Sequence, residues 1–544
     1  MIKLARFIQV ETKSPKTWII SMAALSGVAN GIILMAINVA ADNVHDKAKE
    51  LVLLVFLLSM FLIYVYALHY ALSQSLNAVE DGLEKIKIRI AGKIRNTSLR
   101  FMEEHQDIGM YSALIQDTNM ITEGVVQSIY TIQNCLMLIV TGMYLTVMSP
   151  LAFVAVFSLV GCMLPIYLKK FNKTNEEMER TAKKEGEFLN YFNAVLKGFK
   201  ELKLNQRESD DIYLQLRNVS KDMQKIMTSS NLSFIFDMIF SSSIVFAILL
   251  VTVFIVPSLT PTHSDVIHSI TSSIIFIMGP LVMLATGIPV FAKTNNSIER
   301  LYTLEAKVDS VNSSMSNNAN QYPLCTEFKT LEMEGALFHY RDASGDCLFT
   351  SGPHSFKLEK GSLLFIVGGN GSGKSTFLKL LTGLYQPEEG SLYLDGELLE
   401  SSQYPAYREL FSIVFTDFHL FDRIYGLPDL NESDVNYWLK EMKLEKKTQF
   451  HDYSFTNINL STGQKKRLAF IVAVLRNHPI CIFDELAADQ DPQFRQYFYE
   501  TVLPRLKKQG RTIIVVSHDE PYFHCADSVL RLEDGKIKSL DLFF

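Results

Sequence analysis

Six stretches of about 20 mostly apolar residues occupy the first half of this chain, and they constrain its fold more than any other feature. A helix needs about this length to cross the hydrocarbon core of a bilayer. The chain is 48% hydrophobic, and the excess lies before about residue 295. We expect transmembrane helices at roughly 17–40, 52–74, 124–147, 150–168, 233–256 and 268–291.

The connections between these stretches alternate in positive charge. The leader 1–17 carries four Lys and Arg, the connection 76–120 carries six, and the connection 169–230 carries thirteen. The three connections on the opposite side carry two in total. Because Lys and Arg concentrate on the cytoplasmic side of membrane proteins, the pattern predicts a multi-pass protein with both termini in the cytoplasm.

The two long cytoplasmic connections contain charged, helix-prone stretches such as 84–89 and 175–180. Two alternatives are solvated loops and helices that continue beyond the bilayer. Long structureless loops are uncommon in compact proteins, so we expect helices that extend into the cytosol.

A few residues inside the apolar stretches have their own interpretation. Asp237 is an ionisable residue in the fifth stretch, and it either lines a cavity or sits at the cytoplasmic interface. Pro280 and Pro289 are expected to bend the sixth helix and free backbone carbonyls toward a cavity. Met278 and Met283 are interpreted as packing residues.

A glycine-rich run follows the apolar strand-like segment 362–367 and precedes the helix-like segment 376–381. A strand leading through such a turn into a helix points backbone N–H groups and the positive helix end at one spot, which suits phosphate. In this Gly-x-x-x-x-Gly-Lys-Ser pattern the lysine reaches the β and γ phosphates and the serine hydroxyl binds Mg²⁺. We expect phosphate binding by Gly368, Gly369, Asn370, Gly371, Ser372, Gly373, Lys374, Ser375 and the following Thr376.

A second phosphate-linked element is the apolar run 480–483, which ends in Asp484 and Glu485. A strand delivers such carboxylates to the edge of an open α/β sheet where ligands bind. Asp484 is expected to hold the Mg²⁺ shell, and Glu485 to orient the attacking water or accept its proton. The alternative is an ordinary helix-capping acidic pair.

Between these two elements lies Leu460-Ser461-Thr462-Gly463-Gln464, which resembles the signature of ATP-binding-cassette (ABC) ATPases. The resemblance implies that Ser461, Gly463 and Gln464 contact ATP. It further implies that Tyr340 stacks on adenine, that Asp491 contributes from the loop after the Asp-Glu strand, and that His518 contacts the γ-phosphate.

Six apolar spans followed by one cassette resemble a half-size ABC exporter: a membrane all-α six-helix exporter domain followed by an α/β P-loop NTPase (ABC ATPase) domain. We expect a transmembrane domain at 1–300, a linker at 301–328 and the nucleotide-binding domain at 329–544. The subgroup most similar is the cyclic-peptide and siderophore-peptide exporters, of the pyoverdine and syringomycin types. The supporting segments are 369–374, 414–417, 484–492 and 200–205.

Two departures from the family pattern stand out. Thr416 takes the place of the usual glutamine that binds Mg²⁺, so either Thr416 or Asp417 is expected to supply that oxygen. The segment 454–459, before the signature, lacks the usual Glu-Arg-Gly of exporters.

The resemblance implies a bacterial cytoplasmic-membrane homodimer that uses ATP and Mg²⁺, with its ATPase domain in the cytoplasm. The expected partners are a second copy of the chain, membrane lipid and a peptide-like small-molecule substrate. No nucleic acid is expected, because no basic patch with interleaved aromatics occurs, and the six cysteines show no metal-binding spacing. The alternatives are a lipid or multidrug exporter and a non-transporting ATP-dependent membrane regulator. A peptidase-linked exporter is not expected, given the 17-residue leader.

Overall fold

The computed structural model describes residues 2–12, 16–42, 47–104, 113–255, 264–312, 325–342 and 344–542. The chain divides into two compact units. One contains Met1–Arg95 and Asp107–Lys307, and the other contains Asn96–Gln106 and Val308–Phe544. A short segment from the first half of the chain therefore belongs structurally with the second half.

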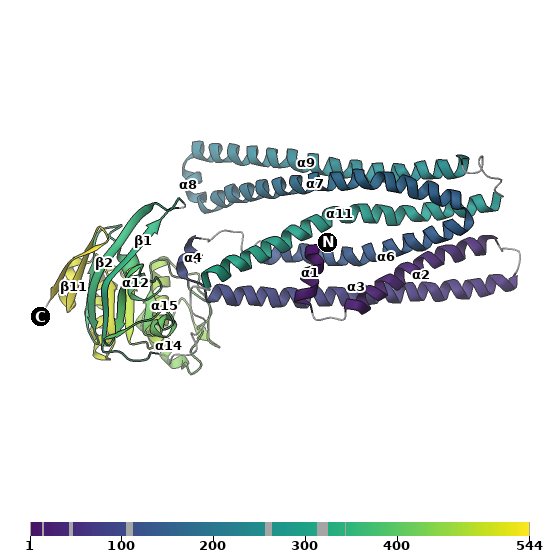
Figure 1. The fold of residues 1–544 in the computed structure, drawn as a ribbon. Helices are drawn as coiled ribbons and strands as arrows, with labels where there is room; N and C mark the ends of the chain where they lie inside the picture. The colour runs from purple at the N-terminus through teal and green to yellow at the C-terminus, as the bar shows by residue number, and fades with distance from the viewer. Residues whose placement is uncertain are drawn as a thin grey trace. The chain divides into compact units, whose positions relative to one another are not determined.

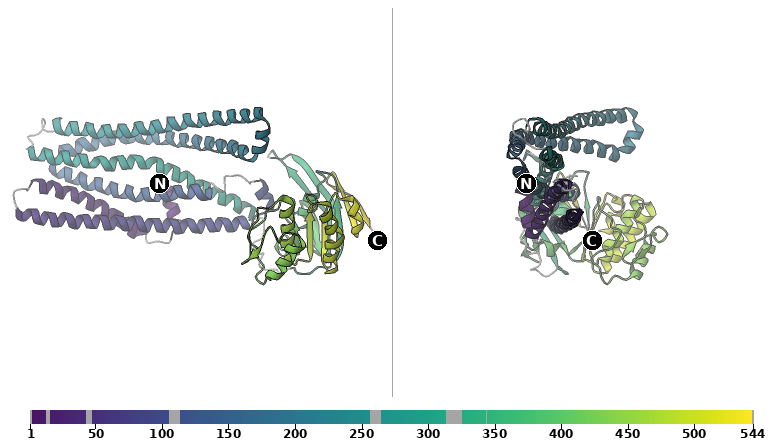
Figure 2. Two further views of the ribbon diagram at one scale, coloured as in Figure 1. Left: turned by 180° about the vertical axis from the view of Figure 1, so that it is seen from behind. Right: turned by 90° about the vertical axis from the view of Figure 1, so that its right-hand side faces the viewer.

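The described part of the first unit is helical (Figures 1 and 2). Its helices and π-helical turns are α1 (Ile2–Glu11), α2 (Lys16–Asp42), α3 (Lys47–Arg95), η1 (Ala113–Asp117), α6 (Thr118–Met148), α7 (Pro150–Lys197), α8 (Phe199–Leu204), α9 (Gln206–Leu250), η2 (Val251–Ile255) and α11 (Ser264–Asn312).

Among the described residues, four helical stretches are long and apolar enough to cross a membrane. They are Lys16–Ala40, Leu51–Arg95, Leu114–Met148 and His268–Ser310. The remaining expected spans, 150–168 and 233–256, fall mainly on α7 and α9, where many side chains lie outside the described part of the chain. The side chain of Asp237 is one of these.

The expectation that helices continue beyond the apolar spans is confirmed. Helix α3 continues to Arg95, α7 to Lys197, and α9 begins at Gln206. The expected linker 301–328 needs a correction, because α11 runs without a break through Pro280 and Pro289 to Asn312. Residues 301–312 are therefore helical, and residues 313–324 lie outside the described part.

Close helix contacts hold the first unit together. Helix α2 packs on α3 and α6. At Gly27 a Cβ atom would lie 2.3 Å from the Gln133 carbonyl oxygen, so only glycine permits this approach of α2 to α6. Helices α7 and α9 lie side by side as a long hairpin joined through α8 (Figure 1).

An ion-pair network fastens α1 to α3 and α11. The Arg89 guanidinium donates to Glu11 at 2.9 Å and to Glu305 at 2.7 Å, and Lys93 also donates to Glu305. Glu11 is 8% exposed, so its charge needs this partner. The short first helix is thus a fixed part of the bundle.

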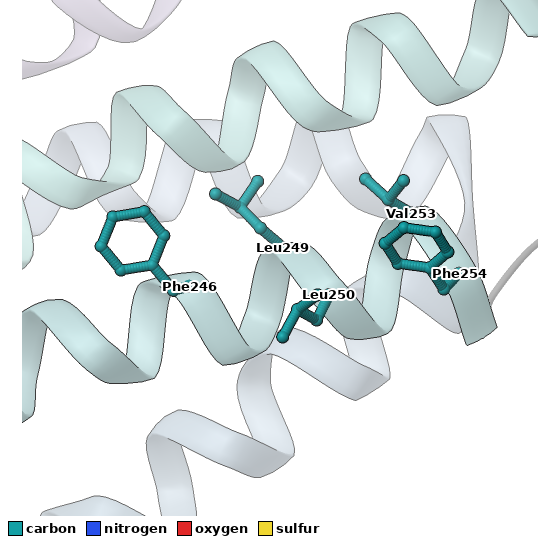
Figure 3. A pocket seen from close by; sticks show the side chains of 5 residues that line it. All are labelled: Phe246, Leu249, Leu250, Val253 and Phe254. Carbon is teal, nitrogen blue, oxygen red and sulfur yellow. The ribbon is translucent and has the colours of Figure 1, made fainter.

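A cavity of about 310 Å³ lies along α9 and η2 (Figure 3). The described side chains that line it are all apolar: Phe246, Leu249, Leu250, Val253 and Phe254. These side chains offer no hydrogen-bonding group for a phosphate or a peptide amide.

The second unit contains the helix α4 (Leu99–Glu104) and a mixed α/β domain. The strands are β1 (Thr330–Arg341), β2 (Cys347–Glu359), β3 (Leu363–Val367), β4 (Glu389–Leu394), β5 (Glu397–Leu398), β6 (Phe411–Val414), β7 (Phe450–His451), β8 (Ser454–Phe455), β9 (Ile480–Asp484), β10 (Thr512–Val516), β11 (Ser528–Glu533) and β12 (Lys536–Leu542). The helices that follow α4 are α12 (Lys374–Leu381), α13 (Tyr404–Arg408), α14 (Glu432–Glu441), α15 (Thr462–Leu475), α16 (Pro492–Tyr497), η3 (Phe498–Val502), α17 (Leu503–Lys508) and η4 (Glu520–Cys525).

Two main sheets form this domain. One has the order β2-β1-β4-β5 and the other the order β12-β11-β3-β10-β9-β6. Strands β3, β10, β9 and β6 are parallel neighbours, and every residue of β3, β9 and β10 is buried. Runs that are apolar on both faces produce such central strands, because both faces are covered.

Candidate functional site

The parallel strands bring the expected catalytic segments to one edge of the sheet. Val516 pairs with both Ile366 and Asp484, so β3, β10 and β9 end at the same level, and β6 lies next to β9. The glycine-rich run follows β3, His518 follows β10, Glu485 follows β9 and Thr416 follows β6. The carboxyl edge of parallel strands is where ligands bind in open α/β sheets.

The glycine-rich run 368–375, here called the phosphate loop, wraps the start of α12. Gly371 and Gly373 have φ values of +77° and +92°, which L side chains rarely adopt. A Cβ atom on Gly369 or Gly371 would meet nothing within 4 Å, so the loop borders open space. Lys374 is 8% exposed, and its ammonium donates to the carbonyls of Gly368 and Gly369 at 2.8 and 2.9 Å.

These features fit the binding of a nucleoside triphosphate. The open side of the loop offers backbone N–H groups and the N-terminus of α12, and the exposed Ser375 hydroxyl stands at the same helix start. The buried Thr376 and Ser372 lie behind them. The charge on Lys374 is held by weakly binding carbonyls that phosphate oxygens can replace.

The Asp484 carboxylate has an oxygen atom that a bound metal ion could contact. It is 3% exposed, and its Oδ2 atom is buried with no hydrogen-bond partner among the described residues. Burial, followed by the charge of Glu485, raises the pKa of Asp484 to about 6, although the Thr416 backbone and Lys374 act in the opposite direction. A bound cation would favour the ionised carboxylate, so these groups fit Mg²⁺.

The two residues expected to act on the γ-phosphate face each other. The His518 Nε2 atom lies 3.4 Å from Glu485 Oε1. Glu485 has a φ of +49°, an unfavourable conformation for a side chain with a Cβ atom, and strain of this kind is typical of functional sites. The structure thus brings together Lys374, Asp484, Glu485 and His518, as the sequence motifs predicted.

The segment 460–464, here called the signature segment, forms the start of α15. The Ser461 backbone N–H donates to the Gln464 side chain at 3.2 Å, as in a helix-capping box. The carbonyl of Gly463 accepts a bond of 2.9 Å from Gln490 Nε2. A Cβ atom at Gly463 would lie 2.8 Å from the Asp489 carbonyl oxygen, so glycine is required for this packing.

The Asp491 side chain makes two hydrogen bonds within the chain. Its side chain accepts from the Phe494 backbone N–H at 2.9 Å, which caps α16, and from Arg467 at 3.0 Å. These two bonds lower the pKa of Asp491. The residue therefore ties the loop after β9 to α15.

Tyr340 belongs to an aromatic cluster at the end of β1. Its ring lies 5.2 Å from Phe338 and 6.1 Å from Tyr385, measured between centroids. Its hydroxyl is 3.3 Å from Thr376 Oγ1 and 3.4 Å from the Tyr385 hydroxyl. The half-buried ring thus sits beside the helix that begins with the phosphate loop.

The same cluster holds helix α4. Glu103 of α4 accepts a bond of 2.8 Å from Lys379 and a short bond from the Tyr385 hydroxyl. Burial, and then the bond to Glu103, raise the pKa of Tyr385, so its phenol keeps the proton it donates. Arg100 lies over the Phe338 ring at 5.2 Å and pairs with Glu388 at 3.2 Å.

Sequence reasoning did not find these α4 contacts. Glu103 and Arg100 lie in the expected cytoplasmic connection 76–120, but no motif links them to the aromatic cluster. The only signal is the charged, helix-prone composition of that connection.

Comparisons with known proteins agree with this geometry. The sequence profile of the ABC transporter family matches residues 352–488. The chain is 28% identical to the ATP-binding protein SyrD of Pseudomonas syringae pv. syringae, over 97% of this chain and 95% of that protein. It is 26% identical to the ATP-dependent lipid A-core flippase of Blochmanniella floridana, over 63% of this chain and 60% of the flippase. A bacterial Atm1-family ABC exporter with ATP bound has the same fold, with a TM-score of 0.77 and 17% identity, covering 96% of this chain and 95% of the other.

Proposed function

We propose, from the premise that this chain belongs to the ABC transporter superfamily as a half-size exporter, that two copies of it export a peptide-like small molecule across the bacterial cytoplasmic membrane. As an ABC exporter it binds ATP and couples ATP hydrolysis to transport. The observation that supports ATP hydrolysis by this chain is that one edge of the sheet brings together four residues: Lys374, Asp484, Glu485 and His518.

Each of these residues has a distinct part in hydrolysis. The phosphate loop and Lys374 bind and orient the phosphates, and Ser375, Asp484 and either Thr416 or Asp417 would hold Mg²⁺. The metal ion supplies neutralisation of phosphate charge. Glu485 orients the attacking water and accepts its proton, and His518 contacts the γ-phosphate.

The signature segment makes a second copy necessary. In this superfamily, the phosphate loop and the signature segment of one chain contact different ATP molecules. Two copies related by rotation give two equivalent sites, each formed by Lys374 and Ser375 of one copy and by Ser461, Gly463 and Gln464 of the other. Tyr340 would stack on the adenine and Asp491 would lie along the shared surface.

The membrane arrangement follows from the sequence. We assign the helical unit, Met1–Arg95 and Asp107–Lys307, to a six-helix transmembrane domain and residues 329–544 to the ATPase domain. The excess of Lys and Arg in the connections 76–120 and 169–230 supports a cytoplasmic ATPase domain and cytoplasmic termini.

Helix α4 is the part of the connection 76–120 that senses the ATPase domain. It is held by Glu103, Lys379 and Tyr385, and Tyr385 also touches Tyr340. ATP binding that moves Tyr340 would therefore act on α4 and, through the chain, on α3. Such coupling requires that ATP bind one conformation more tightly than the other.

A cyclic peptide or siderophore precursor is the cargo that the sequence favours. The segments 369–374, 414–417 and 484–492 resemble those of cyclic-peptide exporters. The match to SyrD extends along nearly the whole chain. A lipid is the second candidate cargo, because lipid A-core flippases also match this chain.

The experiment measures Mg²⁺-dependent ATPase activity and cargo uptake with the full chain in lipid vesicles. Glu485→Gln should retain ATP binding and lose hydrolysis by at least about 100-fold, because the proton acceptor is removed. Glu397→Gln, at an exposed glutamate of the same domain, is the matched control. Normal turnover in Glu485→Gln would remove Glu485 from its role.

Uptake into inside-out vesicles then distinguishes the cargo classes. A cyclic lipopeptide and a fluorescent lipid are offered separately, with Glu485→Gln vesicles as the background. ATP-dependent movement of the lipid alone would favour the flippase alternative, and hydrolysis with movement of neither probe would favour a non-transporting regulator.

A further inference from the structure

A buried lysine on α15 touches the backbone of the proposed catalytic glutamate. Lys466 lies in the basic run 465–467 but is only 6% exposed. Its ammonium donates to the Glu485 carbonyl oxygen at 2.9 Å and pairs with Asp489 Oδ2 at 2.7 Å. A lysine is rarely buried without partners, because removing its charge from water costs free energy.

The carbonyl that accepts the Lys466 hydrogen bond belongs to a residue with a strained backbone conformation. Glu485 has a φ of +49°, and its N–H donates to the Val516 carbonyl at 3.1 Å. Both polar groups of its backbone are therefore fixed: the N–H by β10, and the carbonyl by Lys466 at 2.9 Å together with a longer bond of 3.3 Å from the Ala488 N–H. A left-handed conformation persists only when the surroundings hold it in place.

We propose that Lys466 is a positioning residue for hydrolysis, which holds the Glu485 peptide so that its carboxylate faces His518 and the reacting water. This inference rests on the proposed role of Glu485. Without the ammonium, the Glu485 carbonyl keeps only the longer bond from the Ala488 N–H, so the strained peptide is held less firmly and the carboxylate is displaced. Small displacements of a reacting group reduce rates strongly.

Neighbouring contacts would keep the rest of the loop in place when Lys466 changes. Arg467 donates to Gln490 Oε1 at 2.7 Å and to Asp491 at 3.0 Å, and Gln490 donates to the Gly463 carbonyl. These bonds dock the loop after β9 on α15 without Lys466. A change at Lys466 should thus act on Glu485 and leave ATP binding intact.

The ion pair with Asp489 offers a separate explanation for the burial of Lys466. Asp489 is half exposed, so the pair gains little from charge attraction. If the pair mattered for catalysis, Asp489→Asn would be as harmful as loss of the lysine. If the carbonyl bond matters, Asp489→Asn is nearly neutral.

The test compares Lys466→Met, Lys466→Gln and Asp489→Asn in the full chain in nanodiscs, with kcat and KM for ATP and the affinity for a fluorescent ATP analogue. Methionine keeps the side-chain volume but cannot donate, and we expect kcat to fall by about 10- to 100-fold with KM within threefold. Asp489→Asn should stay within twofold of the wild type. An unchanged kcat in Lys466→Met would overturn the inference.

Two further measurements separate positioning from general stability. In a Glu485→Gln background, Lys466→Met should lower the residual hydrolysis by less than twofold, because its effect passes through Glu485. Equal losses in both backgrounds would overturn the proposal. Normal turnover in Glu485→Gln alone would instead refute the proposed function.

Lys466→Gln covers the case in which the methionine variant does not fold. Glutamine removes the charge and keeps a donor, so its kcat should exceed one-tenth of the wild-type value. A glutamine variant that binds ATP normally but has a kcat below one-tenth of the wild-type value would show that the charge, and not the bond to the carbonyl, is required. That result would overturn the proposal.

Discussion

Removing one hydroxyl from the aromatic cluster should loosen helix α4. Tyr385→Phe keeps the ring on Phe338, at a centroid distance of 4.5 Å, but removes the donor to Glu103. Glu103 would keep only Lys379 and Arg100 would keep Glu388. The variant therefore removes one bond between α4 and the rest of the second unit, together with the longer contact of 3.4 Å to the Tyr340 hydroxyl.

The size of the effect follows from burial. A hydrogen bond to a charged group contributes about 1.5–3 kcal/mol when it is buried. Glu103 is 30% exposed, so water replaces part of the lost bond, and about 1–1.5 kcal/mol is expected. This free energy corresponds to an increase of about 5- to 12-fold in the population with α4 detached.

Hydrogen–deuterium exchange of the full chain in nanodiscs measures this population directly. Exchange rates of the α4 amides report the opening equilibrium of that segment, so they should rise by the same factor. Tyr425→Phe, at a tyrosine that is 61% exposed in the same domain, is the control and should leave α4 unchanged. Protection of α4 within twofold of the wild type in Tyr385→Phe would refute the role assigned to this bond.

Three further predictions concern other parts of the chain. Gly463→Ala should abolish the ATP-dependent association of two ATPase domains, measured as cross-linking of two copies. Its Cβ atom would lie 2.8 Å from the Asp489 carbonyl oxygen and would displace the signature segment from its place at the proposed shared site. His354 is buried, and burial lowers its pKa to about 4, so below pH 6.5 unfolding takes up a proton and stability falls until about pH 4. The loss at pH 5 is about 2 kcal/mol, and the drop in Tm between pH 7.5 and pH 5 should shrink in His354→Gln but not in the exposed control His451→Gln. Gly27→Val should lower Tm by separating two membrane helices, whereas Gly92→Val, which would meet nothing within 4 Å, should not separate packed elements; equal losses would contradict this account.

Much of the ATPase domain could be predicted from the sequence because its motifs follow strands. The apolar runs before Gly368, Glu485 and Ser517 are central parallel strands, and such strands end at one edge. The phosphate loop, Asp484, Glu485 and His518 therefore converge as the motifs predicted.

Other features depend on three-dimensional contacts that no local pattern encodes. Lys466 stands in a run of three basic residues, which is typical of a solvated surface, yet the packing of α15 against β6 and β9 buries it. The left-handed conformation of Glu485 and the bonds of Glu103 arise from segments that are far apart in sequence. The expected boundary at residue 300 was also too early, because the helical pattern of α11 has no strong stop signal before Asn312.

The position of Lys374 has a consequence for the turnover cycle. Its ammonium already donates hydrogen bonds to two carbonyls of its own loop, so the loop has internal contacts that hold its shape without a bound anion. The departure of phosphate and ADP would then leave no bare buried cation behind, and the next ATP would meet a receptor that is already folded. Rebinding of ATP should therefore require an exchange of the Lys374 contacts only, and no refolding of the phosphate loop.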